Sequence, residues 1–113
     1  MNKKRSVLIV DDDEAIRLCL KEYFELEGFL VIEAINGIEA EVCLRQKKTD
    51  YLLLDIVMPG RDGIEIILSL KNSDINIIAM SGDPYYLEVA VALGANAALA
   101  KPFDFAYLKE LIR

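Results

Sequence analysis

The chain has 113 residues, of which 54% are hydrophobic and 28% charged, and its net charge is −6. This length suits one ordinary domain, and the balance of residues is typical of a globular protein rather than a disordered or fibrous one. The negative charge argues against nucleic acid or an anionic membrane as a partner, and no apolar run reaches the roughly 20 residues of a membrane helix. We therefore expect a cytoplasmic protein in which residues 1–113 form one domain.

Short apolar runs alternate along the chain with longer segments whose apolar residues have helical spacing. In chain order, we predict strand 6–10, helix 14–27, strand 29–34, helix 38–47, strand 51–54, helix 64–72, strand 76–80, helix 84–93, strand 97–100 and helix 104–112. Asp13 and Asp83 are suited to be N-caps, Gly28 to end the first helix, and Asn36-Gly37 to form a turn. The alternation predicts an α/β fold, a doubly wound parallel sheet of five strands with five flanking helices.

The central strand is Tyr51–Leu54, which is followed at once by Asp55 and stopped by Pro59-Gly60. A continuously apolar run suits the middle of a parallel sheet that is covered on both faces. Asp55 would then lie at the carboxyl end of that strand, where open α/β sheets bind their ligands. Alternatively, Asp55 caps the next turn, which is a common role of aspartate.

Polar residues follow the other predicted strands in the same way: Asp11, Asp12 and Asp13 after the first, Ser81 after the fourth and Lys101 after the fifth. In a parallel sheet these ends point to one edge, so carboxylates, a hydroxyl and an ammonium would meet there. Clustered carboxylates repel one another, and oxygen ligands suit Mg²⁺. Such a site can receive a phosphoryl group on an aspartate. Each residue alone also has a simpler interpretation, as a helix cap or a solvated charge, but the combination favours the site.

Histidine is absent and only two cysteines are present, Cys19 and Cys43. The lack of histidine excludes Ser-His-Asp and Cys-His mechanisms, so chemistry must depend on carboxylates, hydroxyls and lysine. Both cysteines fall at apolar helical positions without metal-site spacing, and we predict that they are reduced core residues.

Four segments together resemble the receiver domain of two-component response regulators: residues 7–13, 54–60, 80–82 and 100–103. The resemblance extends over essentially the whole chain. It implies a flavodoxin-like strand order 2-1-3-4-5, with the first and last helices on one face of the sheet and the middle three on the other. Cys19 and Cys43 would then lie on opposite sides of the sheet, which excludes a disulfide between them.

The resemblance also implies the role of each site residue. Asp55 would accept a phosphoryl group from a histidine kinase or phosphotransfer protein. Asp12, Asp55 and the backbone carbonyl of Val57 would bind Mg²⁺, and Asp11 would reach the ion through water. Ser81 would bind a phosphoryl oxygen. Lys101 would pair with the phosphoryl group, and the bond between Lys101 and Pro102 would be cis.

Two departures from the family pattern bear on signalling. Ala98 stands where the family usually has a switch aromatic, so a shift would have to pass through Ser81 and the fourth helix instead. Val57 and Asp83 occupy positions that tune dephosphorylation in the family. A downstream protein would bind the face of the fourth helix, fifth strand and fifth helix, where the exposed candidates are Tyr85, Tyr86, Glu88 and Tyr107.

Two other functions stay open on the sequence. A Mg²⁺-dependent phosphatase resembling the haloacid-dehalogenase-like enzymes would also use an aspartyl phosphate, and 11–13 superficially fits the opening motif of those enzymes. The chain has no room for their substrate cap. A phosphorylation-independent interaction module draws support from Ala98, and it predicts that Asp55→Asn leaves partner affinity unchanged.

Overall fold

The computed structural model describes residues 4–58 and 63–113, so the predicted break at Pro59-Gly60 lies outside the described residues. Its elements in chain order are β1 (Ser6–Val10), α1 (Glu14–Leu26), β2 (Leu30–Ala34), α2 (Gly37–Gln46), β3 (Tyr51–Asp55), α3 (Gly63–Ser69), β4 (Asn76–Ser81), α4 (Pro84–Leu93), β5 (Ala97–Ala100) and α5 (Phe105–Leu111). Every predicted strand and helix is present, and most of the predicted ends differ by only a residue or two.

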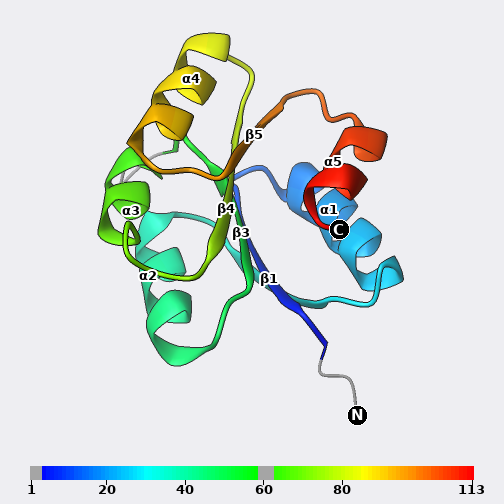
Figure 1. Ribbon diagram of the computed structural model, residues 1–113. Coiled ribbons are helices and arrows are strands. Elements are labelled where there is room, and N and C mark those ends of the chain that lie inside the picture. Colours follow the sequence, from blue (N-terminus) through cyan, green and yellow to red (C-terminus); the bar gives the residue numbers. More distant parts are fainter. Residues whose placement is uncertain (1–3, 59–62) are drawn as a thin grey trace.

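The strands form one five-stranded parallel sheet in the order β2-β1-β3-β4-β5. Helices α1 and α5 lie on one face of the sheet, and α2, α3 and α4 lie on the other (Figure 1). The doubly wound, flavodoxin-like fold is therefore confirmed. All the carboxyl ends of the strands point to one edge, which is the edge where the sequence places its polar residues.

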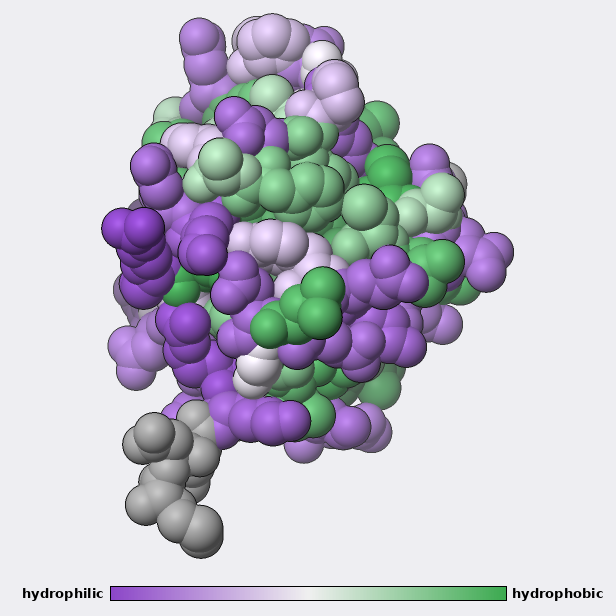
Figure 2. Space-filling view, turned by 90° about the vertical axis from the view of Figure 1, so that its right-hand side faces the viewer, coloured by the Kyte–Doolittle hydropathy of each residue, from purple (hydrophilic) through white to green (hydrophobic). Residues whose placement is uncertain are grey.

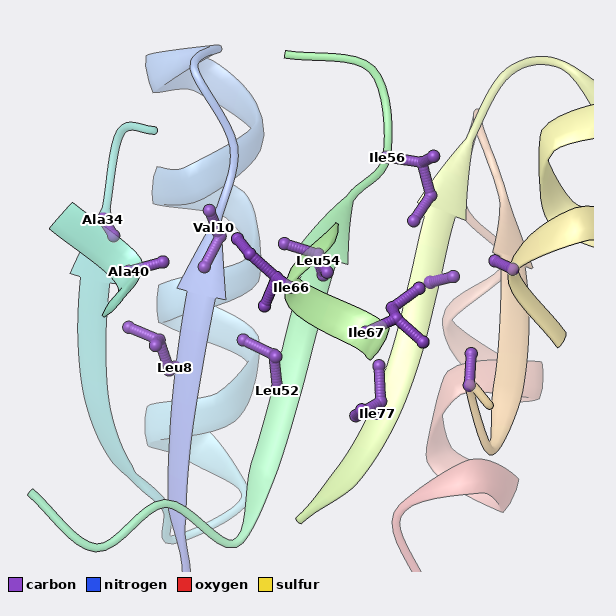
Figure 3. Close-up of a cluster of buried hydrophobic side chains, with 13 residues drawn as sticks. Leu8, Val10, Ala34, Ala40, Leu52, Leu54, Ile56, Ile66, Ile67 and Ile77 are labelled. Carbon is purple, nitrogen blue, oxygen red and sulfur yellow. The ribbon is translucent and has the colours of Figure 1, made fainter. Parts of the chain in front are cut away.

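Two hydrophobic clusters cover the two faces of the sheet, because successive strand residues point to opposite sides. On the face of α2, α3 and α4, Leu8 and Leu52 pack with Ile66 and Ile67 (Figure 3). On the other face, residues of β1 and β3 pack against α1 and α5. Every residue of β1 and β3 is buried. These central strands are thus held on both faces, and their polar ends have a rigid support.

Side-chain caps set the starts of the helices that flank the site. Asp13 caps α1, accepting hydrogen bonds from the backbone of the first turn, and Asp83 caps α4 in the same way. Asn36 caps α2 by accepting from the backbone N–H of Glu39 at 2.9 Å. This cap starts α2 at Gly37, one residue earlier than predicted.

The prediction that both cysteines are core residues is wrong for Cys19, which is exposed. The buried residues of α1 are Leu20 and Phe24. Adjacent helix positions differ by about 100° in direction, so Cys19 faces away from the stripe that Leu20 occupies. Cys43 is partly buried on the opposite face of the sheet, and both cysteines are free thiols.

The surface over α1 and α5 is mixed in character. Hydrophilic residues surround a band of moderately hydrophobic ones on this side of the molecule (Figure 2). No helix within residues 4–58 and 63–113 has both the length and the hydrophobicity needed to cross a bilayer.

Candidate functional site

The polar residues predicted to gather at the carboxyl edge of the sheet do so. Asp11 follows β1, Asp55 ends β3, Ser81 ends β4 and Lys101 follows β5. Three of them are almost inaccessible, with exposed fractions of 0% for Asp11, 5% for Asp55 and 4% for Ser81. Buried polar groups need partners, because an unpaired one costs about 1 to 3 kcal/mol. The partners of these three residues are Lys101 and nearby backbone N–H groups.

Lys101 joins the two buried carboxylates. Its Nζ atom donates a hydrogen bond to Asp11 Oδ2 at 2.7 Å and lies 3.4 Å from Asp55 Oδ2. The backbone N–H of Lys101 donates to the carbonyl of Ser81 at 3.0 Å, and the bond between Lys101 and Pro102 is cis. Lys101 is thus not a solvated surface charge, which was the simpler interpretation of this residue.

Asp11, Asp12 and Asp55 form a group that could hold a metal ion. One carboxylate oxygen from each lies within 4.8 Å of the others. The ammonium of Lys101 contacts two of the three carboxylates, those of Asp11 and Asp55, so the group keeps an excess of negative charge and has oxygen atoms as possible ligands. Hard divalent cations such as Mg²⁺ prefer such oxygen ligands. Asp13, the third aspartate of the run, is instead the N-cap of α1.

Backbone groups fix the orientation of the two buried carboxylates. The N–H of Asp13 donates to Asp11 Oδ1 at 2.9 Å, and the N–H of Val57 donates to Asp55 Oδ1 at 3.2 Å. The backbone of Val57 is therefore beside the predicted site, while its residue as a whole is exposed. The second oxygen of each carboxylate remains directed at Lys101.

The surroundings of Asp55 change its protonation. Burial, and secondly the negative charge of Asp11, raise the pKa of Asp55 to about 6, although Lys101 and the Val57 N–H act in the opposite direction. Burial by itself would lower the pKa of Lys101, but the hydrogen bond to Asp11 and the charges of both carboxylates raise it overall. At neutral pH Asp55 is consequently ionised, and Lys101 is a cation beside it.

Ser81 connects the site to α4. Its Oγ atom accepts a hydrogen bond from the backbone N–H of Asp83 at 3.0 Å, and the Asp83 carboxylate accepts from the N–H of Tyr85 at 2.9 Å. The residue that caps α4 is Asp83, so the cap interpretation of Ser81 is wrong. Because the Ser81 oxygen accepts from the chain, its own hydrogen is available to donate toward the site.

Sequence reasoning missed Arg17. Its Nη1 atom donates to the backbone carbonyl of Asp11 at 2.8 Å, and its Nε atom lies 3.4 Å from Glu33 Oε1 in β2. Arg17 thus ties α1 and β2 to the end of β1 that carries the acidic residues. Its position one turn after the N-cap Asp13 was the available signal, since a side chain there points back toward the preceding turn.

The expected partner face has the predicted exposure. Ala98 on β5 lies in an apolar hollow of about 440 Å³, together with Leu87 and Val91 of α4. The residues around it that were predicted to be exposed are so: Tyr85, Tyr86, Glu88 and Tyr107.

A doubly wound sheet whose carboxyl edge gathers buried carboxylates, a hydroxyl and a lysine defines a class of small α/β domains equipped to receive a phosphoryl group. Comparison with known families makes the class specific. The family model for the response regulator receiver domain matches residues 7–113. The chain belongs to this family.

Individual relatives agree with that membership. Sporulation initiation phosphotransferase F of Bacillus subtilis (strain 168) is 37% identical over 117 residues, which cover 100% of this chain and 93% of that protein. The transcriptional regulatory protein CpxR of Escherichia coli (strain K12) is 36% identical, and the match covers 100% of this chain but 48% of CpxR. The structure of TrrA from Thermotoga maritima in complex with Mg(2+)-BeF has a TM-score of 0.87 at 34% identity, with 96% of each chain covered.

The chain is accordingly a phosphoacceptor receiver domain of two-component signalling. Receiver domains take phosphoryl groups from histidine kinases or phosphotransfer proteins, and they typically bind Mg²⁺. The phosphatase alternative is not favoured, because the relatives are response regulators. The family places the chain among signalling domains.

Proposed function

We propose that Asp55 is the phosphoacceptor of this receiver domain, which we take to comprise residues 1–113. The observation that carries the proposal is the position of Lys101 Nζ, 3.4 Å from Asp55 Oδ2, on the edge where Asp11 and Asp12 also meet. Asp55 is the member of this group at the end of the central strand β3. A phosphoryl group on the Asp55 carboxylate would therefore lie close to Lys101 and to the other two carboxylates.

The residues present fit Mg²⁺ as the metal. Asp11, Asp12 and Asp55 offer clustered carboxylate oxygens, and the backbone carbonyl of Val57 would complete the protein's share of ligands. Lys101 offsets only one of the three carboxylate charges, so a divalent ion would reduce the remaining repulsion among the carboxylates. When bound, Mg²⁺ neutralises negative charge on phosphoryl oxygens and favours transfer.

The transfer itself needs an ionised nucleophile and two hydrogen-bond donors. An oxygen of the Asp55 carboxylate attacks the phosphorus, the new oxygen–phosphorus bond forms, and the bond from phosphorus to the donor's histidine nitrogen breaks. Lys101 donates to one phosphoryl oxygen and the Ser81 hydroxyl to another, so both stabilise the developing charge. Because the pKa of Asp55 is raised to about 6, the metal-free carboxylate loses its ionised, nucleophilic form as the pH drops through that value.

These groups also assist the domain's own phosphorylation and dephosphorylation, and the phosphorylated form acts by changing partner affinity. A phosphoryl group that accepts a hydrogen bond from the Ser81 hydroxyl would shift Ser81. That shift would also move Asp83, the N-cap of α4, because the Asp83 N–H donates to Ser81 Oγ. The face formed by α4, β5 and α5 is our candidate for the downstream protein partner. A protein rather than nucleic acid is expected, since the chain carries a net charge of −6.

The direct test is to incubate the protein with Mg²⁺ and acetyl phosphate and to weigh the intact chain by mass spectrometry. We expect the mass of one added phosphoryl group. It should be absent when a chelator is present during the incubation, and absent in Asp55→Asn. Asp74→Asn is the matched control, because it removes an exposed carboxylate and should still be phosphorylated. Incorporation that persists in Asp55→Asn would contradict the assignment. Unchanged partner affinity on phosphorylation would instead favour the phosphorylation-independent module suggested by Ala98.

A further inference from the structure

A second hollow, of about 520 Å³, lies at the opposite edge of the sheet from Asp55. Its lining comes from the amino ends of β1 and β2 and from the segment between α2 and β3, and this segment passes below those two strands in Figure 3. The Ser6 hydroxyl fixes that segment by donating to the carbonyl of Lys48 at 2.8 Å. Since β1 has five residues at about 3.3 Å each, this hollow lies about 15 Å from the phosphoryl site.

Three exposed lysines surround the hollow: Lys4, Lys47 and Lys48. Within the described part of the chain, no ion pair joins any of the three to an acidic side chain. Their clustering contrasts with the net charge of −6 for the whole chain. Like charges that converge without a partner attract an anion.

The other charged groups of the hollow are already occupied. The Asp50 carboxylate accepts from the backbone N–H of Ser6 at 2.8 Å and from its hydroxyl at 3.3 Å. The Arg5 guanidinium lies 4.5 Å from the centre of the Phe29 ring and donates to the carbonyl of Ile112 at 2.6 Å. Arg5 is therefore engaged by Phe29 and Ile112, and the Asp50 carboxylate is engaged by Ser6. The three lysines are the charged groups that remain available, so the free charge of the hollow is positive.

The wall of the hollow on β2 is apolar. Leu30 and Ile32 line it, and their spacing of two residues puts both side chains on one face of this edge strand. Leu30 is 55% exposed, so part of its side chain is accessible to a ligand in the hollow. Lysine ammonium groups beside exposed aliphatic side chains suit a ligand that has both an anionic and an apolar part.

We propose that this hollow is a binding site for an organic polyphosphate of nucleotide size, separate from the phosphoryl site. The phosphates would contact Lys4, Lys47 and Lys48, and the organic part would lie on Leu30 and Ile32. A volume of about 520 Å³ falls in the range of small-molecule sites, roughly 300 to 1,000 Å³. Lysine is a suitable phosphate ligand because its ammonium is a compact point charge with three donors.

The test is an NMR titration of the full chain in EDTA with three probes, namely ADP, pyrophosphate and adenosine. We expect ADP to shift the methyl signals of Leu30 and Ile32 and the amides of Lys47 and Lys48, with little change at Ser81. The expected order of affinity is ADP, then pyrophosphate, then adenosine. Shifts confined to the Ser81 edge would overturn the proposal, and so would pyrophosphate binding as tightly as ADP.

A pair of variants isolates the lysines. Lys47→Ala/Lys48→Ala should weaken ADP binding about tenfold, because each exposed ion contact accounts for a factor of about 1.4 to 5. Lys71→Ala/Lys109→Ala makes the same change in net charge outside the hollow and should leave ADP affinity unchanged. An equal loss in both double variants would overturn the site. Acetyl phosphate should label Asp55 equally in all of these proteins, which separates this proposal from the phosphoacceptor assignment.

Discussion

Replacement of the proposed phosphoacceptor should stabilise the metal-free protein. Asp55 is buried near Asp11, and Lys101 is the cation that both carboxylates share. Asparagine has almost the same shape, so it can still accept the hydrogen bond from the Val57 N–H. Asp55→Asn removes one buried negative charge and leaves the 2.7 Å contact between Lys101 and Asp11 in place. The variant should therefore unfold at higher denaturant concentration than the wild type.

The magnitude follows from the shifted pKa. Folding raises the pKa of Asp55 from an ordinary 3.8 to about 6, and each pKa unit corresponds to about 1.36 kcal/mol. The folded wild type is thus penalised by about 2 to 3 kcal/mol once the carboxyl is ionised in both states. Below a pH of about 4 the group is protonated in both states and the penalty is absent; it grows as the pH rises toward 6.

Urea denaturation in EDTA over a series of pH values measures this difference directly. The gap in unfolding free energy between Asp55→Asn and the wild type should be about 2 to 3 kcal/mol at neutral pH and close to zero below the pKa of an ordinary carboxyl. Mg²⁺ should narrow the gap, because a ligand of the folded wild type stabilises it. Asp74→Asn, an exposed substitution, should show no such pH dependence. A variant no more stable than the wild type at neutral pH would refute the reasoning.

Four further substitutions test other parts of the structure. Lys101→Met leaves Asp11 buried without its cation and should lower the unfolding free energy by about 3 kcal/mol in urea denaturation; unchanged stability would contradict the pairing. Gly63→Ala places a Cβ 2.9 Å from a backbone atom of the segment after β3 and should cost about 1 to 3 kcal/mol, whereas Gly82→Ala meets nothing within 4 Å and should be nearly neutral. Asp13→Ala removes the cap of α1 and should cost about 1 kcal/mol, seen as a lower Tm; a Tm equal to that of the wild type would show that the cap contributes little.

The strands and the edge they share were predictable because both depend on local patterns. β1 and β3 are continuously apolar, and each is followed by an aspartate, so a parallel sheet brings Asp11 and Asp55 to one edge whatever the details of packing. Lys101 followed from the same rule. That Asp11 is fully buried and accepts from Lys101 at 2.7 Å was not predictable, because it depends on side chains that are 90 residues apart in sequence.

The errors arose where several local interpretations fit the same residues. Cys19 was assigned to the core because it is apolar and helical, but Leu20 and Phe24 supply the buried residues of α1. For Ser81 a helix cap stayed open as an alternative, and the structure decides it, because Asp83, the predicted N-cap, occupies that position. Arg17 was missed although it lies one turn after the N-cap Asp13, because no motif marks its hydrogen bond to the carbonyl of Asp11. The roles of Cys19, Ser81 and Arg17 depend on the direction in which each side chain points. Residue spacing alone does not determine that direction.

The packing of α4 suits this helix to respond to a change at Ser81. Ala90 is the one buried residue among the ten that make up α4, so little apolar contact has to be broken to shift it. Ala98 of β5 lines a hollow beside α4 and has only a small side chain to pack against the helix. The start of the helix is linked to the site through the hydrogen bonds from Asp83 to Ser81 and from Tyr85 to Asp83. A ligand that moves the Ser81 hydroxyl would therefore act on the start of α4 through these two hydrogen bonds, a route that does not pass through position 98.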